Sequence, residues 1–345
     1  MSQAETARFL IESRGAVREL GAFVVAARFD PDAQAVAFAL GDGTLRLVNT
    51  TDPESWREIP VHVGAVLALA AHPAGGFISG GDDGRLRRTE LDGTVTDIAS
   101  FGMKWVEQVA SHPGEKGVFA CAVGKVAHLF DRSGTKLKEL VHPSSVTGLG
   151  FDGKGKRIAA SHYNGASLWF VAARNGTPRL LEWKGSHIGI AIHPDAEAVV
   201  TAMQENALHG WALPGGKHMR MSGYPGKTQS MSFTRTGKWL ASSGADAMVL
   251  WPFFGGGPMG KAPLELAGGD GVPCTQVACH PKEDMVAGGF ADGLVVLADI
   301  SSSRILPIAP PGHGPVSTLA WNAHGSHLAI GTETGFAALI DLSKR

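Results

Sequence analysis

The chain has 345 residues, of which 44% are hydrophobic and 18% are charged. Its 31 lysines and arginines nearly balance its 32 aspartates and glutamates, so the formal net charge is −1. This balance gives no electrostatic reason to bind nucleic acid or an anionic membrane, and we expect neither as a partner.

Cysteine usage and hydropathy indicate a reducing, aqueous compartment. Cys121, Cys274 and Cys279 show no CxxC spacing and cannot all pair with one another, which argues against a disulfide framework or a zinc knuckle. Residues 1–20 carry acids and arginines where a secretory signal needs an uninterrupted apolar core. The longest apolar run elsewhere, residues 63–71, is far shorter than the ~20 residues of a membrane helix. We therefore expect a cytoplasmic protein.

One short pattern recurs along the whole chain. Its eight copies read VVAARFDP, LALAAHP, EQVASHP, TGLGFDG, GIAIHP, SMSFTR, TQVACHP and STLAWNA. The residue before the turn recurs every 40 to 46 residues, and a four-stranded propeller blade takes ~40 to 45. The spacing predicts a single domain over residues 1–345, a β-propeller of eight four-stranded blades. The inner strands of copies one to eight are expected to end near Phe29, Ala71, Ser111, Phe151, Ile192, Phe233, Cys279 and Trp321.

The side chains within each copy follow a strand pattern. Two positions before the residues just named, every copy has an apolar side chain, and one position before them seven of the eight have a small one. Successive strand residues face opposite ways, so one face of this strand offers bulk while the other stays small. A turn rich in Pro, Gly and Asp follows, then a second strand, a second tight turn and two further strands. No apolar run shows a sustained 3.6-residue period, so the fold is predicted to be all-β.

The order of these elements resembles the repeat of the WD-repeat family, in which a Gly-His pair precedes the inner strand and the third strand ends in Trp-Asp. The pair is present as Gly312-His313. A tryptophan ends the third strand at Trp169, Trp211 and Trp251, and none of these is followed by aspartate. The resemblance spans nearly the whole chain and implies a β-propeller that binds other proteins.

The family also ties a blade together with a hydrogen-bonded set of His, Ser or Thr, Asp and Trp. A buried polar set is stable only when its members satisfy one another, so these residues are expected to be structural. The members that the resemblance implies are His142, Ser161, Asn164 and Trp169 in copy four, and Ser243, Asp246 and Trp251 in copy six.

The last copy lacks a fourth strand, because it stops after its third strand as ALIDLSKR. Residues 1–20 precede the first inner strand. Either ARFLI from Ala7 or AVREL from Ala16 is expected to supply the missing outer strand of the last blade. Closing the ring in this way removes an exposed sheet edge. A seven-bladed ring with one copy diverted is the alternative.

One motif is typical of a phosphate-binding loop. Residues 255–261, GGGPMGK, fit the pattern G-x-x-x-x-G-K. However, Ala262 stands where Ser or Thr should hold magnesium, and Pro263 stands where a helix should begin. We interpret the segment as a long loop of copy six and expect no nucleotide or other cofactor.

The fourteen histidines raise the question of a metal site. Equivalent positions in different blades are spread around a ring, too far apart for ligands that must lie ~2 Å from one ion. The His-Pro histidines are therefore expected to stabilise turns, and no metal site is predicted. His142 and His162 are the best remaining pair of candidate metal ligands. The His-Pro histidines are His72, His112, His193 and His280.

Met103, Lys104 and Trp105 are the preferred candidates for contacting a partner. They precede an inner strand, and the loops that lead into the inner strands converge on one end of the channel. In the WD-repeat family, which the chain resembles, that end of the channel is a frequent binding surface. Core packing of Trp105 is the alternative.

Phe253, Phe254 and Met259 are the second candidates. Phe, Trp and Met are enriched in the cores of protein interfaces, so this loop is a possible anchor for a partner. The alternative is that the two phenylalanines fold back over the edge of the blade, since isolated exposed aromatics need no explanation.

These observations predict a non-catalytic adaptor that binds other proteins, as a monomer or as part of a hetero-complex. No paired carboxylates, Ser/His/Asp set or cofactor fingerprint occurs at a meaningful spacing. A metal- or small-ligand-binding propeller is the alternative, and an enzyme with its site at the mouth of the channel is a third reading.

Overall fold

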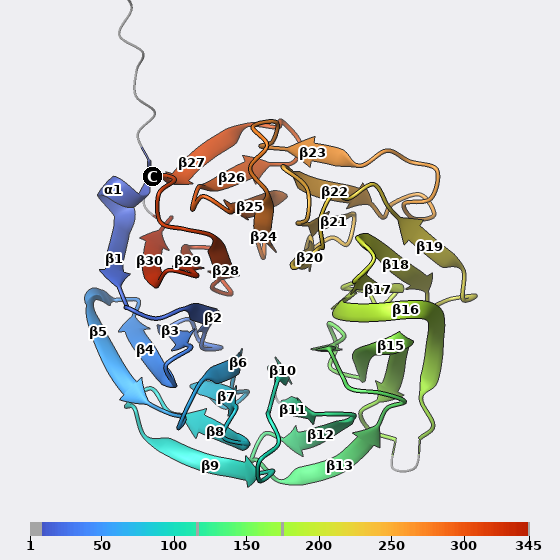
Figure 1. The fold of residues 1–345 in the computed structure, drawn as a ribbon, viewed down its shortest axis with the longest axis horizontal. Helices are drawn as coiled ribbons and strands as arrows, with labels where there is room; N and C mark the ends of the chain where they lie inside the picture. Colours follow the sequence, from blue (N-terminus) through green and yellow to red (C-terminus); the bar gives the residue numbers. More distant parts are fainter. Residues whose placement is uncertain (1–8, 115–116, 174–175, 344–345) are drawn as a thin grey trace, which may run out of the picture.

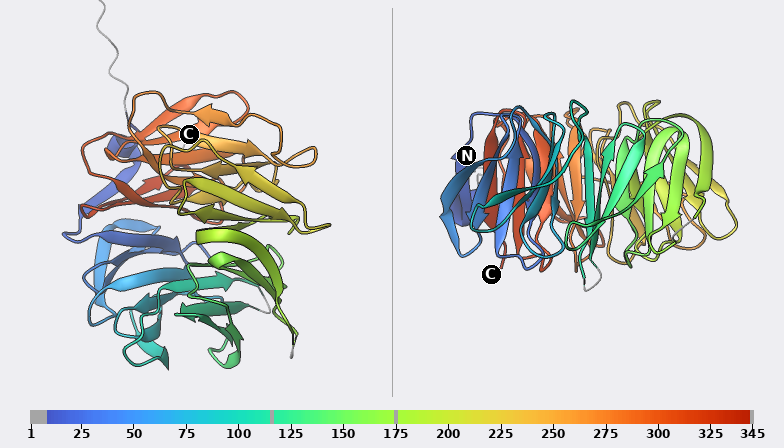
Figure 2. Two further views of the ribbon diagram at one scale, coloured as in Figure 1. Left: turned by 45° about the vertical axis from the view of Figure 1, so that its right-hand side comes forward. Right: turned by 90° about the horizontal axis from the view of Figure 1, so that it is seen from below.

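The computed structural model describes residues 9–114, 117–173 and 176–343. These residues form strands arranged in radial sheets around one central axis, with a single short helix, α1 (Ile11–Arg14), among them (Figure 1). Figure 2 shows from the side that the strands cross the thickness of a disc, with loops on both of its faces. The all-β, single-propeller prediction is confirmed.

Copies one, two, three, six and seven each form a separate antiparallel sheet of four strands. In every one of them the inner strand lies at the predicted position. The strands are β2 (Val24–Phe29), β3 (Ala35–Leu40), β4 (Thr44–Asn49) and β5 (Asp52–Pro60) in copy one; β6 (Val66–Ala71), β7 (Phe77–Gly81), β8 (Arg85–Thr89) and β9 (Val95–Ser100) in copy two; β10 (Gln108–His112), β11 (Val118–Val123), β12 (Val126–Asp131) and β13 (Lys136–Val141) in copy three; β20 (Met231–Phe233), β21 (Trp239–Ser242), β22 (Met248–Pro252) and β23 (Leu264–Leu266) in copy six; and β24 (Cys274–Cys279), β25 (Met285–Phe290), β26 (Val295–Asp299) and β27 (Ile305–Ala309) in copy seven.

Copies four and five are joined into one six-stranded sheet. Its strands are β14 (Gly148–Phe151), β15 (Arg157–Phe170), β16 (Arg179–Ile192), β17 (Ala198–Met203), β18 (Ala207–Ala212) and β19 (His218–Met221). β15 is a hairpin that turns at Asn164 and Gly165, where φ is +67° and +140°, and the Val171 amide donates to the Lys156 carbonyl across its two arms at 2.9 Å. β16 pairs with β15 through its first half and with β17 through its second half.

The expectation of eight separate blades is therefore corrected. The described residues form seven hydrogen-bonded sheets, and the alternative count of seven matches. The cause is the unbroken strand β16, which runs from the outer position of copy four into the inner position of copy five. No copy is diverted, because the inner strands of all eight copies follow one another around the channel (Figure 1).

The ring closes in copy eight through a strand from the amino-terminal part of the chain. β28 (Val316–Trp321), β29 (His327–Thr332) and β30 (Phe336–Asp341) receive β1 (Gly15–Glu19) as their outer strand. β1 pairs antiparallel with β30 from Gly15 opposite Ile340 to Glu19 opposite Phe336. The closing strand thus contains Ala16–Glu19 of the AVREL segment, whereas the other candidate, ARFLI from Ala7, begins outside the described residues and ends in α1.

Apolar side chains fill the spaces between neighbouring sheets. Phe38, Phe77 and Phe119 are fully buried, each in a separate cluster of the core. Leu10 and Ile11, which precede the closing strand, pack against the cluster that lies between copies seven and eight. The core therefore extends around the whole ring and includes the segment that closes it.

Three of the His-Pro histidines, His112, His193 and His280, also bond to the neighbouring copy. His280 Nδ1 accepts the Glu283 amide of its own turn at 2.9 Å, while Nε2 donates to the Gly325 carbonyl of copy eight at 3.0 Å. His193 bonds in the same way to Asp195 of its own turn and to Gly237 of copy six. The neutral Nε2–H tautomer satisfies both bonds, so these rings link each turn to the next copy.

The closing strand is expected to stabilise the whole ring. Deleting residues 1–19 removes the buried Ala16, the apolar contacts of Leu10 and Ile11, and the partner of β30. Burying one such aliphatic side chain contributes about 1.5 to 3 kcal/mol, so the free energy of unfolding should fall by about 3 kcal/mol or more. Urea unfolding would measure it, with a deletion of residues 2–8 as the control that keeps α1 and β1. An unchanged unfolding midpoint for the longer deletion would contradict this role.

Candidate functional site

The loops that join one copy to the next and the second turns lie on the same face of the disc. The Gly43 carbonyl, in the second turn of copy one, accepts the amides of Val61 and His62 in the loop that leads to copy two. In the same way the Gly84 carbonyl of copy two accepts the Phe101 amide of the following loop at 2.8 Å. We call this side the inter-copy face.

Five large apolar side chains from successive copies are exposed on the inter-copy face. We call them the exposed apolar cluster. Each belongs to an inter-copy loop or to a second turn of copies one to four, so they cover one sector of the ring. They are Phe23, Val63, Met103, Trp105 and Tyr163, with exposed fractions of 43%, 85%, 95%, 57% and 56%.

The loop that carries Met103, Lys104 and Trp105 presents all three side chains to solvent. Val106, the next residue, is fully buried instead and packs in the core between copies two and three. Its amide donates to the Gly81 carbonyl at 3.1 Å. The loop is therefore anchored through Val106, and Trp105 does not pack in the core as the alternative proposed.

Copy two contains a buried polar set that the sequence reasoning missed. His62 Nδ1 donates to Asp83 Oδ1 at 2.9 Å, and Ser79 Oγ donates to His62 Nε2 at 2.9 Å. Burial lowers the pKa of His62, although Asp83 opposes this shift. Asp83 Oδ2 also accepts the Val63 amide at 3.2 Å, so the set holds the base of the exposed apolar cluster. The sequence spacing of its three members is close to the spacing predicted for the set in copy four. That spacing could have revealed the set in copy two.

The hydrogen-bonded set predicted in copy four does not form. Among the described residues, neither ring nitrogen of His142 has a hydrogen-bond partner. Trp169 Nε1 has none there either. The two rings meet edge to face instead, with centroids 6.0 Å apart. Asn164 lies in the turn of the β15 hairpin, where its Oδ1 accepts the Gly185 amide, and the Ser161 hydroxyl lies 3.2 Å from that of Thr147.

Copy six forms a set with different members from those predicted. Trp251 Nε1 donates to the Tyr224 hydroxyl at 2.6 Å, and Tyr224 bonds in turn to Ser242, whose hydroxyl donates to the Val249 carbonyl. Tyr224 thus takes the place of the histidine. Ser243 instead accepts two amides of the preceding loop, from Gln229 and Ser230. Asp246 lies outside this chain of bonds.

Two family models match parts of the chain. The model described as "WD domain, G-beta repeat" matches residues 54–87, which include the set of His62, Ser79 and Asp83. The model described as "Anaphase-promoting complex subunit 4 WD40 domain" matches residues 277–345. Both matches fall on sheets of the ring described above. The chain belongs to the WD-repeat β-propeller family.

Curated relatives of this WD-repeat protein are longer than the chain. It is 24% identical over 329 residues to "Telomerase protein component 1" of Mus musculus, a match that covers 90% of the chain and 12% of that protein. It is 21% identical over 310 residues to "Autophagy-related protein 16" of Arabidopsis thaliana, which covers 86% of the chain and 59% of that protein. The crystal structure of the computationally designed Ika8 protein has the same fold, with a TM-score of 0.74, 18% identity and coverage of 93% and 96%.

The glycine-rich loop of this WD-repeat protein runs between strands β22 and β23, so it does not join a strand to a helix. Phe253 is half-buried against Phe233, with ring centroids 5.0 Å apart, which agrees with the fold-back alternative. Phe254 and Met259 remain 46% and 45% exposed. Lys261 Nζ lies 4.8 Å from the Phe254 ring centroid and donates to carbonyls of its own loop, so the loop satisfies its own lysine.

Two pairs of described histidines lie close together. The rings of His142 and His162 have centroids 6.0 Å apart. His209 Nε2 lies 3.0 Å from His218 Nδ1, against the ring of Trp183. Within residues 9–114, 117–173 and 176–343, no group of three His, Cys, Asp or Glu side chains is arranged to hold a metal ion. The same residues contain no helix long and apolar enough to span a membrane.

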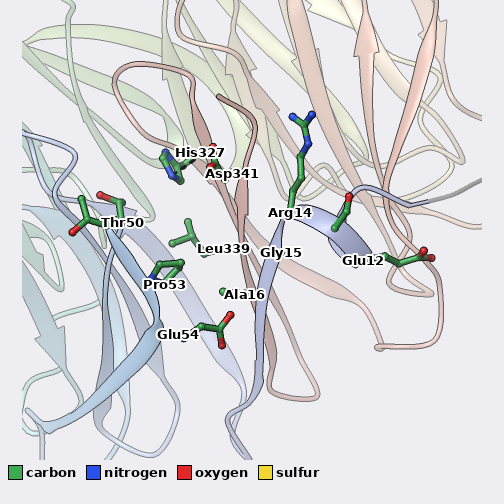
Figure 3. A pocket seen from close by; sticks show the side chains of 12 residues that line it. Glu12, Arg14, Gly15, Ala16, Thr50, Pro53, Glu54, His327, Leu339 and Asp341 are labelled. Carbon is green, nitrogen blue, oxygen red and sulfur yellow. Dashed lines mark ion pairs between the residues drawn. The ribbon is translucent and has the colours of Figure 1, made fainter. Parts of the chain in front are cut away.

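A cavity of about 480 Å³ lies at the seam where the closing strand meets copy one. Figure 3 shows Glu12 and Arg14 on one side of it and His327 beside Asp341 on another. The lining mixes both signs of charge, and Glu54 on its floor already pairs with Arg18 at 3.6 Å. This arrangement favours no single class of ligand.

Tyr224 allows a matched test of the set in copy six, because Tyr163 is the only other tyrosine in the chain and is exposed. Tyr224→Phe leaves Trp251 Nε1 without its acceptor in a buried place. The free energy of unfolding should fall by about 1 to 3 kcal/mol, whereas Tyr163→Phe should leave it unchanged. Chemical unfolding of both variants measures the difference, and equal stabilities would disprove the structural role of Tyr224.

His142 is expected to make the protein less stable in acid. Burial, with a smaller effect from His162, lowers the pKa of His142 to about 4. The unfolded chain takes up this proton near the ordinary pKa of about 6.5, so stability should be lost as the pH falls from about 6.5 to about 4 and level off below. His142→Leu should flatten this part of the profile of unfolding free energy against pH. A profile as steep as that of the unsubstituted protein would show that His142 does not contribute.

Proposed function

We propose that this WD-repeat protein is a non-catalytic adaptor that binds another protein through the exposed apolar cluster. The carrying observation is that five large apolar side chains from successive copies share one face of a closed ring. Apolar surface gathered on one face of a soluble protein is typical of an interaction surface. Met, Trp, Tyr and Phe are also the side chains enriched in the cores of protein interfaces.

The similar proteins support a binding role. One matching model is named after a subunit of the anaphase-promoting complex, and one relative is named as a component of telomerase. Both names belong to members of larger assemblies. A ring whose sheets pack tightly presents its loops at fixed positions, which suits a protein that holds a partner.

The buried polar set of copy two supports a non-catalytic role over an enzymatic one. Ser79, His62 and Asp83 have the hydrogen bonds of a Ser-His-Asp triad. However, a nucleophile must reach its substrate, and Ser79 is only 1% exposed within its sheet. We therefore assign these residues a structural function.

We also propose that the protein acts in the cytoplasm. Cys121, Cys274 and Cys279 are free thiols, as a reducing compartment would keep them. Burial raises the pKa of Cys274 and of Cys279 to about 12, so both remain protonated and unreactive.

Affinity purification from the native cell, read by quantitative mass spectrometry, tests the binding surface. The double variant Met103→Ser and Trp105→Ser should lose the recovered partner by at least about tenfold, since interface aromatics commonly contribute 2 kcal/mol or more, about 30-fold in affinity. The melting temperature should stay the same, because both side chains are exposed.

The matched control carries Phe254→Ser and Met259→Ser in the glycine-rich loop. Our proposal expects this control to keep the partner. Loss of the partner in the control alone would move the binding surface to the loop between β22 and β23. Retention in both variants would contradict a role for either surface.

A further inference from the structure

The second turns on the inter-copy face carry mostly acidic side chains. Six of the eight carry a carboxylate, and the only basic residue among them is Lys125 in copy three. The chain as a whole is nearly neutral, so this charge is concentrated by position and not by composition. The carboxylates belong to Asp42, Asp82, Asp83, Glu205, Asp246, Asp292 and Glu333.

Several of these carboxylates accept a hydrogen bond from a backbone amide of their own turn. Asp42 Oδ1 accepts the Thr44 amide at 3.0 Å, and Asp292 Oδ1 accepts the Leu294 amide at 2.9 Å. Asp82 differs, because its Oδ1 is buried and has no hydrogen-bond partner in the described part of the chain. Arg85 and Arg87 of the following strand both pair with Asp97 at 2.7 Å. Asp82 Oδ1 is therefore left without a hydrogen-bond donor within the described residues.

Asp82 lies in the middle of the exposed apolar cluster. Its amide donates to the Ala65 carbonyl at 3.2 Å, and Gly64 packs so closely on its carboxylate that an added Cβ would lie 2.3 Å from Oδ1. These contacts place it beside Val63. On its other side the same turn bonds to the loop of Met103 and Trp105, through the amides of Phe101 and Val106.

We propose that the exposed apolar cluster recognises a basic segment of its protein partner, and that Asp82 pairs with an arginine or lysine side chain of that segment. The inference rests on the proposed function, because it names the partner chemistry at the same surface. The aliphatic stem of the cation lies over Val63 and Met103, where both side chains are exposed. Trp105 adds an aromatic face, which attracts a cation at close range. The carboxylate of Asp82 and the apolar surface beside it thus both favour an arginine or lysine side chain.

Selection from a random dodecapeptide library displayed on phage tests this specificity without a known partner. The purified full-length protein should enrich peptides in which Arg or Lys stands beside a large apolar residue. The strongest peptide is then synthesised with arginine and with citrulline, which keeps the shape and loses the charge. Enriched peptides without an excess of basic residues, or no enrichment above that on Trp105→Ala, would overturn the inference.

Binding of the two peptides to Asp82→Asn completes the test. The charged peptide should bind Asp82→Asn at least about tenfold more weakly, the change expected for one lost charge-assisted hydrogen bond. The citrulline peptide should bind both proteins equally. Asp270→Asn is the matched control, because Asp270 is an exposed acidic residue on the same face, in the loop that leads to copy seven. This variant should bind the charged peptide as tightly as the unsubstituted protein does. Equal binding of the charged peptide to Asp82→Asn and to the unsubstituted protein would contradict the role of Asp82.

If the cellular partner needs Met103 and Trp105 but not Asp82, the proposed function holds and only this inference fails.

Discussion

The pairing of β1 with β30 is the constraint on which the rest of the structure depends. Without β1, copy eight would end in an unpaired edge strand, and the first and last sheets would be joined only by the packing of their inner strands and the core between them. With it, each sheet is held between two neighbours, and residues more than 300 positions apart share one hydrogen-bonded ladder. Loops on a closed ring have little freedom to move apart, so the positions of the exposed side chains are set by the closure.

The remaining cohesion comes from contacts between copies. Apolar side chains fill the spaces between sheets, and the His-Pro rings bond from one turn to the next copy. Each buried polar set works inside one sheet and ends near the inter-copy face, as His62 and Asp83 do beneath Val63. The binding surface is therefore built from loops on a rigid support, which is the usual division of labour in repeat proteins. Asp82 is the exception, since its Oδ1 has no hydrogen-bond partner among the described residues.

Strand order and inner-strand positions could be predicted from the sequence, because an apolar column at a spacing of 40 to 46 residues depends only on the chain itself. The fusion of copies four and five could not, since it depends on whether β16 continues through residues 184–186, where Gly185 has a φ of +129° without ending the strand. The polar sets show the same limit. Tyr224 replaces a histidine through a contact across 27 residues with Trp251, and His142 lacks a partner although the family pattern supplies one. Met103 and Trp105 are exposed beside the buried Val106, and the sequence alone does not place Phe23, Val63 and Tyr163 on the same face.

The central claim is that the inter-copy face of copies two and three contacts the partner. Hydrogen–deuterium exchange of the full chain, alone and with the recovered partner, measures this without any substitution. We predict slower exchange on binding in the loops over residues 61–65 and 101–107, with no change in the glycine-rich loop over 253–262. Protection confined to 253–262, or to the turns on the opposite face, would contradict it.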